Sequence, residues 1–294
     1  MFCHQCQETA KNKGCSMNQG VCGKKADVAN LQDLFIWILK GISFWGNKAI
    51  EFDIYNEDTA FFLTKGLFST ITNANFSKDN FLANIKKGIT LRDALKDRFL
   101  SEWKEKNGGD FSSNIPECAL WKPENDADIE KTAESGKGGW LEMDNEDIRS
   151  LRATIQYGLK GISAYLEHGY QIVKDGKEIF EFLMEGLAGL VDDNLTQDDL
   201  ITLVIKTGEY GVKVMKYLDE ANSKYGDPEI TEVSTGVRNN PGILISGHDF
   251  VDLEELLEQT KGTGIDLYTH SEMLPANYRP FFKKYDNLVG NYGN

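Results

Sequence analysis

The chain has 294 residues, of which 40% are hydrophobic, enough for one large or two medium domains with real cores. Its 32 basic and 46 acidic residues give a net charge of −14, which argues against partners such as nucleic acid or an anionic membrane surface. The best apolar run, residues 34–39, is far too short to span a bilayer.

Four of the five cysteines lie near the N-terminus, spaced as Cys3-x2-Cys6-x8-Cys15-x6-Cys22. Two neighbouring thiolates on a tight turn can bind one metal centre, and two more from a short loop complete a four-sulfur set. This spacing favours an iron–sulfur cluster. Zinc, which usually takes a second close pair, and disulfides, which belong to oxidising compartments, are the alternatives. The chain opens without a signal peptide, so we expect a reducing, cytoplasmic location.

The next part of the chain predicts a first set of three helices. Apolar residues fall at helical spacing over residues 31–45, and Asn56 and Ser77 provide start signals for the two helices that follow. Residues 105–139 are rich in Gly and Pro and predict a long connection that is irregular or partly helical. Cys118 lies there without a neighbouring cysteine, so we interpret it as a buried thiol.

A second set of three helices is predicted beyond this connection. Asp144 is the expected cap of its first helix, and Thr196 with Asp199 resembles a capping box at the start of its third. The pentapeptide Leu-Lys-Gly-Ile-Ser at residues 39–43 recurs at residues 159–163, in the first helix of each set. We therefore predict two similar three-helix bundles, whose shared glycines allow close helix packing.

The pattern changes after residue 225. Two short apolar strands, residues 243–246 and 265–268, flank a helix over residues 253–259, which predicts a βαβ unit with a parallel sheet. His248 follows the first strand and Glu272 the second, so both are expected at the edge where the carboxyl ends of the strands meet. Imidazole nitrogen and carboxylate oxygen both bind iron, although a hydrogen-bonding role at the strand ends is the alternative.

These elements predict a mainly α fold. Two three-helix bundles and the cysteine loop occupy residues 1–225, and residues 226–294 begin a Rossmann-like α/β domain with a parallel sheet that is cut short.

The sequence resembles the hybrid cluster proteins, also called prismane proteins or hydroxylamine reductases. The resemblance is carried by Phe-Cys-His-Gln-Cys-Gln-Glu-Thr-Ala at residues 2–10 and Cys-Gly-Lys at residues 22–24. It recurs in family order along the whole chain, at residues 39–43, 245–249, 269–276 and 286–293.

The resemblance implies two metal centres. An N-terminal iron–sulfur cluster would be held by Cys3, Cys6, Cys15 and Cys22, and a hybrid [4Fe–2S–2O] cluster would take His248 and Glu272 among its ligands. The x8 gap is that of family members with [4Fe–4S], whereas the x6 gap is more typical of members with [2Fe–2S]; [4Fe–4S] is favoured. In the family a redox partner protein supplies electrons through the first cluster, and the second reduces hydroxylamine or nitric oxide.

The chain departs from the family pattern in length. The other hybrid-cluster ligands follow residue 294 in the family, so we expect a fragment, a truncated product or a chain completed by another polypeptide. By itself it should be inactive, and its short sheet should self-associate or bind a partner chain. The alternatives are the related carbon monoxide dehydrogenase fold and a non-catalytic iron–sulfur electron-transfer or structural module.

Overall fold

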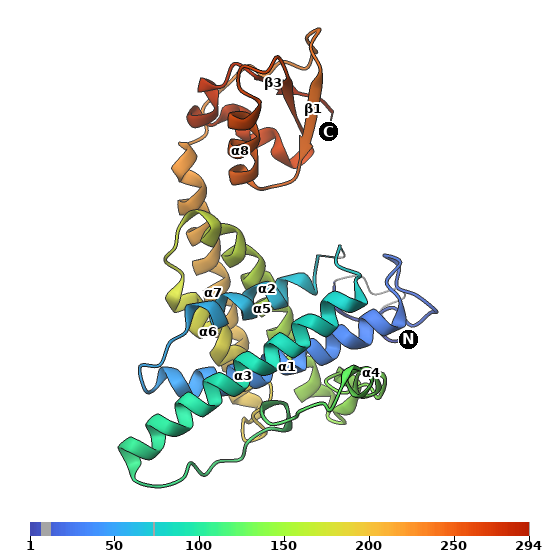
Figure 1. Cartoon of the computed structure of the whole chain (residues 1–294), viewed down its shortest axis with the longest axis vertical. Helices are drawn as coiled ribbons and strands as arrows, with labels where there is room; N and C mark the ends of the chain where they lie inside the picture. Colours follow the sequence, from blue (N-terminus) through green and yellow to red (C-terminus); the bar gives the residue numbers. More distant parts are fainter. Residues whose placement is uncertain (7–12, 73, 294) are drawn as a thin grey trace. The chain divides into compact units, whose positions relative to one another are not determined.

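The computed structural model describes residues 1–6, 13–72 and 74–293. The chain forms two compact units: residues 1–167 with 176–214, and residues 168–175 with 215–294 (Figure 1). The helical part is followed by a small parallel sheet, which confirms the predicted fold class. The domain limits expected at residues 225 and 226 stay a prediction.

Three helices form the first set: α1 (Ala26–Ile50), α2 (Glu57–Ser69) and α3 (Lys78–Asn107). The two predicted start signals are confirmed, because the Asn56 side chain accepts from Thr59 N and the Ser77 hydroxyl accepts from Asn80 N. Helices α1 and α3 run side by side in Figure 1, and α1 also packs on α2.

Helix α1 is the centre of the first unit, because it is buried on nearly all sides. It contacts α3, α6 and α4 as well as α2. Near its C-terminal end, the fully buried Trp45 donates its indole N–H to Ala119 O at 3.0 Å. Around that residue a core cluster gathers Trp45, Ala49, Ile54, Leu95, Phe99 and Ala119.

The connection between the two sets is partly helical, as predicted. It contains η2 (Glu117–Ala119), α4 (Asp126–Glu134) and η3 (Trp140–Glu142). Cys118 is buried there, which confirms that part of its interpretation.

The second set consists of α5 (Glu146–Ile172), α6 (Lys177–Gly189) and α7 (Gln197–Asn222), the last followed by η4 (Ser223–Tyr225). The capping box is confirmed, since Asp199 N donates to the Thr196 hydroxyl and Thr196 N donates to the Asp199 carboxylate. The predicted cap Asp144 is wrong by one residue. Asn145 takes that position, because its side-chain oxygen accepts from the first free amides of α5, Asp147 N and Ile148 N.

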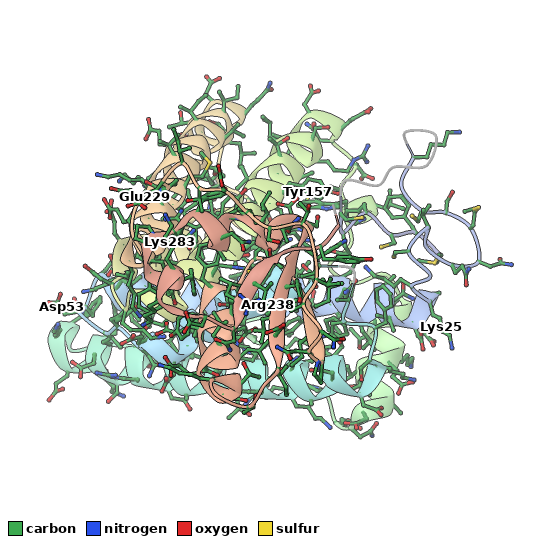
Figure 2. The ribbon with its side chains drawn as sticks, turned by 90° about the horizontal axis from the view of Figure 1, so that it is seen from above. Lys25, Asp53, Tyr157, Glu229, Arg238 and Lys283 are labelled. Carbon is green, nitrogen blue, oxygen red and sulfur yellow. The ribbon has the colours of Figure 1, made fainter. Side chains whose placement is uncertain are left out.

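The second unit holds the sheet. Its elements are β1 (Gly242–Ser246), α8 (Phe250–Thr260), β2 (Asp266–His270), η5 (Ser271–Tyr278), η6 (Pro280–Lys284) and β3 (Leu288–Asn291). The strands are parallel in the order β1-β2-β3, which confirms the predicted βαβ unit and adds a third strand that the sequence did not predict. On its surface, an ion pair between Lys283 Nζ and Glu229 Oε2, 2.6 Å apart, joins η6 to the segment that precedes β1; both residues are labelled in Figure 2.

The two glycines of the repeated pentapeptide give a matched stability test. A Cβ atom at Gly41 would overlap the Cys118 carbonyl oxygen, whereas one at Gly161 would meet nothing within 4 Å. We expect Gly41→Ala to lower the free energy of unfolding by about 1–3 kcal/mol through overpacking. Gly161→Ala should raise it by roughly 0.5–1 kcal/mol, because alanine favours a helix interior.

Urea unfolding of the two variants and the parent chain measures both changes. Equal effects of the two substitutions would show that the packing of α1 on residues 118–119 is not as described.

Candidate metal centres

The N-terminal loop brings two of its cysteines together through the backbone. Cys3 and Cys15 form an antiparallel bridge, in which each amide donates to the other's carbonyl at 2.9 Å. Gly14 makes this pairing possible, because its φ is +70° and a Cβ atom there would lie 2.9 Å from Cys3 O. Both cysteines are buried as a result.

The other end of the loop closes in a second turn. An isolated bridge joins Gln19 to Lys25, and Cys22 is exposed within the turn between them. Lys24 instead points inward, where it is buried and its Nζ lies 3.8 Å from Cys3 Sγ. The turn therefore presents a cation to the first cysteine.

Residues of α5 and α1 hold the Cys3–Cys6 segment. The hydroxyl of Tyr157, which is labelled in Figure 2, donates to His4 O, and Lys160 Nζ donates to Gln5 O at 3.0 Å and to Gln5 Oε1 at 2.6 Å. The Gln5 side chain in turn donates to the Asp33 carboxylate of α1. Both helical sets therefore position the cysteine pair.

Burial dominates the electrostatics of this site. It lowers the pKa of Lys160 to about 7, even though the Asp33 carboxylate acts in the opposite direction. It raises the pKa of Asp33 to about 6 against the effect of nearby lysines, Lys160 first among them. Burial also raises the pKa of the Cys3 thiol, which Lys24 partly offsets.

His4 lies between the two cysteines of the Cys3–Cys6 turn. Its ring is buried between Phe2, with ring centroids 5.1 Å apart, and Trp140, at 6.1 Å. Burial, followed by the charge of Lys160, lowers the pKa of His4 to about 3, so the ring is neutral near pH 7. The sequence could not show this, because Trp140 arrives from the distant connection.

The surroundings of the loop fit an anionic, thiolate-bound group. In the ranges that the structure describes, no three His, Cys, Asp or Glu side chains lie close enough together to hold a metal ion. The backbone bridge nevertheless brings two of the four cysteines together, and the buried Lys24 places its ammonium group beside Cys3. Four thiolates are a suitable donor set for an iron–sulfur cluster in such surroundings.

At the edge of the sheet, the structure brings together the two other predicted site residues. Ser246 and His270 are the last residues of β1 and β2 and are paired with each other, so the two following connections leave the sheet at the same height along the strands. In each connection one residue of positive φ comes next, Gly247 at 123° and Ser271 at 48°, and His248 or Glu272 follows it.

His248 Nε2 and Glu272 Oε2 are 3.7 Å apart, and their side chains are 65% and 68% exposed. Asp249 caps α8 by accepting from Val251 N, which confines His248 to the short turn between strand and helix. An exposed nitrogen and an exposed oxygen at this separation could both bind one metal ion, or could simply form an ion pair.

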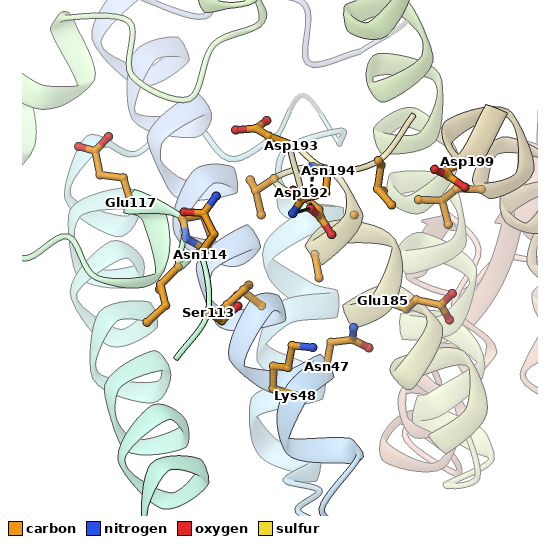
Figure 3. A pocket seen from close by; sticks show the side chains of 18 of the residues that line it. Asn47, Lys48, Ser113, Asn114, Glu117, Glu185, Asp192, Asp193, Asn194 and Asp199 are labelled. Atoms are coloured by element: carbon orange, nitrogen blue, oxygen red, sulfur yellow. Dashed lines mark hydrogen bonds between the residues drawn. The ribbon is translucent and has the colours of Figure 1, made fainter. Parts of the chain in front are cut away.

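A cavity of about 670 Å³ in the first unit is a weaker candidate. Figure 3 shows that acidic and amide side chains surround it. Several of these groups already pair with neighbours: Glu185 with Lys206 at 2.5 Å, and Asp192 with the amide of Asn194 at 2.9 Å. None of the predicted site residues lines it.

Comparison with known proteins identifies the family. The Prismane/CO dehydrogenase family matches residues 1–294. The chain belongs to this family. Hydroxylamine reductases from Halothermothrix orenii and from Desulfitobacterium hafniense strain Y51 are each 52% identical over 295 residues, and that from Caldanaerobacter subterraneus subsp. tengcongensis is 55% identical over 298. Each alignment covers the whole of this chain but only 53%, 52% and 52% of the respective relative. The chain therefore spans about half the length of the curated relatives it matches.

Sequence reasoning missed the buried charged residues of the family site. Asp33, Lys40 and Lys160 lie inside helices that were predicted from their apolar residues alone. A usable signal was present, because each lysine stands between residues predicted to face the core, in a motif that occurs twice.

No helix in the described ranges combines the length and the apolar character needed to cross a bilayer.

The two cysteines that differ most in exposure should differ in reactivity. Cys118 is 1% exposed, and burial raises its pKa to about 12, whereas Cys22 is exposed. The thiolate is the reacting form, so a raised pKa leaves less of it at pH 8, and reaction should speed up only as pH approaches 12. In the metal-free chain we expect Cys118 to be alkylated by iodoacetamide at least roughly ten-fold more slowly than Cys22.

Peptide mass spectrometry over a time course gives the two rates, and the urea-unfolded chain is the control in which they should converge. Similar rates in the folded chain would contradict the burial of Cys118.

Proposed function

We propose that the chain is the electron-entry part of a hydroxylamine-reducing oxidoreductase. The loop that carries Cys3, Cys6, Cys15 and Cys22 holds an iron–sulfur cluster, of the [4Fe–4S] type in preference to [2Fe–2S]. His248 and Glu272 are two ligands of a hybrid [4Fe–2S–2O] cluster in the whole protein. Its substrate is a small nitrogen oxide, hydroxylamine or nitric oxide. A redox partner protein in the cytoplasm supplies the electrons.

The observation that carries this proposal is the anchoring of the cysteine loop. Its first turn is bound to α5 through Tyr157 and Lys160 and to α1 through Asp33. Positioning of a turn by buried polar side chains is what a metal-binding loop requires. The family match and the names of the relatives supply the reaction class.

The chain's own residues prepare the site in three ways. Tyr157 and Lys160 occupy the carbonyl groups of His4 and Gln5, which fixes the direction in which the Cys3–Cys6 turn faces. The bridge between Cys3 and Cys15 sets their spacing, and the stacked ring of His4 excludes water from one side. When bound, the cluster supplies reversible one-electron uptake.

At the sheet edge, the chain's contribution is to present two ligands at one place. The paired strand ends and the short turns hold His248 and Glu272 on neighbouring connections. Because both side chains are exposed, they are accessible to further ligands from outside this chain. Two ligands alone cannot hold a bridged iron cluster, which is bound largely through thiolates.

Anaerobic reconstitution with iron and sulfide tests the first centre. We expect the parent chain to bind iron and acid-labile sulfide in similar amounts and to gain broad visible absorption. Cys15→Ser should lose most of both, because it removes one of four thiolates, while Cys118→Ser should keep them. Binding of zinc without sulfide would refute the assignment.

The second centre is tested by activity. We expect the loaded 294-residue chain, reduced with dithionite, to leave hydroxylamine unreacted, because His248 and Glu272 supply only two ligands. A family hydroxylamine reductase of full length, prepared in the same way, is the positive control. Turnover by the short chain near the rate of that control would contradict the ligand count.

A further inference from the structure

The repeated pentapeptide places one lysine of each helical set at an equivalent position. Lys40 is the fifteenth residue of α1, and Lys160 is the fifteenth residue of α5. The leucine before each lysine and the serine three residues after it are buried in both copies, and each serine hydroxyl donates to a carbonyl of its own helix. The two lysines are buried too, with 3% and 0% exposure.

Lys160 contacts the cysteine loop directly, whereas Lys40 contacts an aromatic ring that packs on it. Lys160 Nζ binds Gln5 O and Gln5 Oε1. Lys40 Nζ lies 4.7 Å from the ring centroid of Trp140, the ring that also packs on His4. Lys160 thus lies at Gln5, and Lys40 lies at the ring that packs on the neighbouring His4.

A buried ammonium group is costly unless negative charge lies nearby. The hydrogen-bond acceptors of Lys160 in Gln5 are neutral oxygens, and Asp33 reaches the lysine only through the Gln5 side chain. Burial lowers the pKa of Lys160 in spite of that carboxylate, so the site would be more favourable with additional negative charge. Four cysteine thiolates around iron would supply it.

We infer that the positive charges of Lys40 and Lys160 together raise the reduction potential of the N-terminal cluster. This inference rests on the proposed function, because it presumes that the cysteine loop binds a cluster. Reduction adds one electron, and therefore one negative charge, to the cluster. Nearby fixed positive charge in a site of low dielectric stabilises that reduced state more than the oxidised one.

Substitutions can remove the charge of each lysine and keep its other contacts. Lys160 both carries charge and donates hydrogen bonds to Gln5, so Lys160→Gln removes the charge and keeps a donor. Lys40 lies over an aromatic ring, so Lys40→Met removes the charge and keeps a side chain of similar length and apolar character. Lys104→Gln is the matched control, because that lysine is 71% exposed on the distant end of α3.

The experiment is a dithionite redox titration of the reconstituted 294-residue chain, followed by absorption and electron paramagnetic resonance. At the midpoint potential of the parent, each lysine variant should have at least a ten-fold lower ratio of reduced to oxidised cluster, which for one electron is about 59 mV. The double variant should show roughly the product of the two changes, and Lys104→Gln should match the parent.

The outcomes distinguish this inference from the function on which it rests. If the parent chain itself binds no iron and sulfide, the proposed function fails and the inference with it. If the variants load normally and their ratios stay within two-fold of the parent, the inference is wrong while the function stands.

A variant that does not load is resolved by a second substitution. Lys160→Arg and Lys40→Arg keep the positive charge, so loading with a potential close to that of the parent would support the inference. Failure of the arginine variants as well would show that the site needs the shape of lysine and not its charge, which overturns the inference.

Discussion

The contact between α5 and the backbone of residues 4 and 5 determines where the cysteine loop lies. Tyr157 and Lys160 bind carbonyl groups that are more than 150 residues away in sequence. Such a contact requires the second helical set to be packed in the first unit, where α6 contacts α1. The backbone of residues 4 and 5 is therefore held by the fold itself. Assembly of the centre thus depends on the fold of the whole first unit.

The sheet edge is built from local rules instead. Parallel pairing of Ser246 with His270 and equally short turns are enough to bring His248 beside Glu272. Neither side chain is anchored by a buried partner in the way that Gln5 is, and both remain largely exposed. A site of this kind presents ligands without enclosing a metal, which suits a centre that takes further ligands from elsewhere. The same chain therefore contains one site anchored by buried side chains and one whose side chains are exposed.

The features predictable from sequence are those fixed by near neighbours. Asn56 and Ser77 cap helices because a side-chain oxygen reaches an amide within the first turn. The strands and helix of the βαβ unit are likewise indicated by the spacing of apolar residues over short segments. The cap of α5 was assigned one residue early because Asp144 and Asn145 are chemically similar, and only backbone geometry distinguishes them. The strand β3 was missed because its register is set by β2 and not by its own four residues. Burial of His4 depends on the distant Trp140 as well as on Phe2, and no local pattern contains Trp140.

The repeat shows how one motif can serve different purposes in its two copies. At the glycine, the copies differ: Gly41 allows close contact with the connection, whereas Gly161 faces open space. At the lysine, they agree in burial, although their contacts differ: Lys160 bonds to Gln5, and Lys40 lies over the Trp140 ring. A lysine buried only for packing would be replaced at no loss by an apolar residue, and usually with a gain in stability. Buried lysines at equivalent positions, one bonded to Gln5 and one over the ring that packs on His4, are therefore better explained by the charge that they bring to that site than by the stability of either helix.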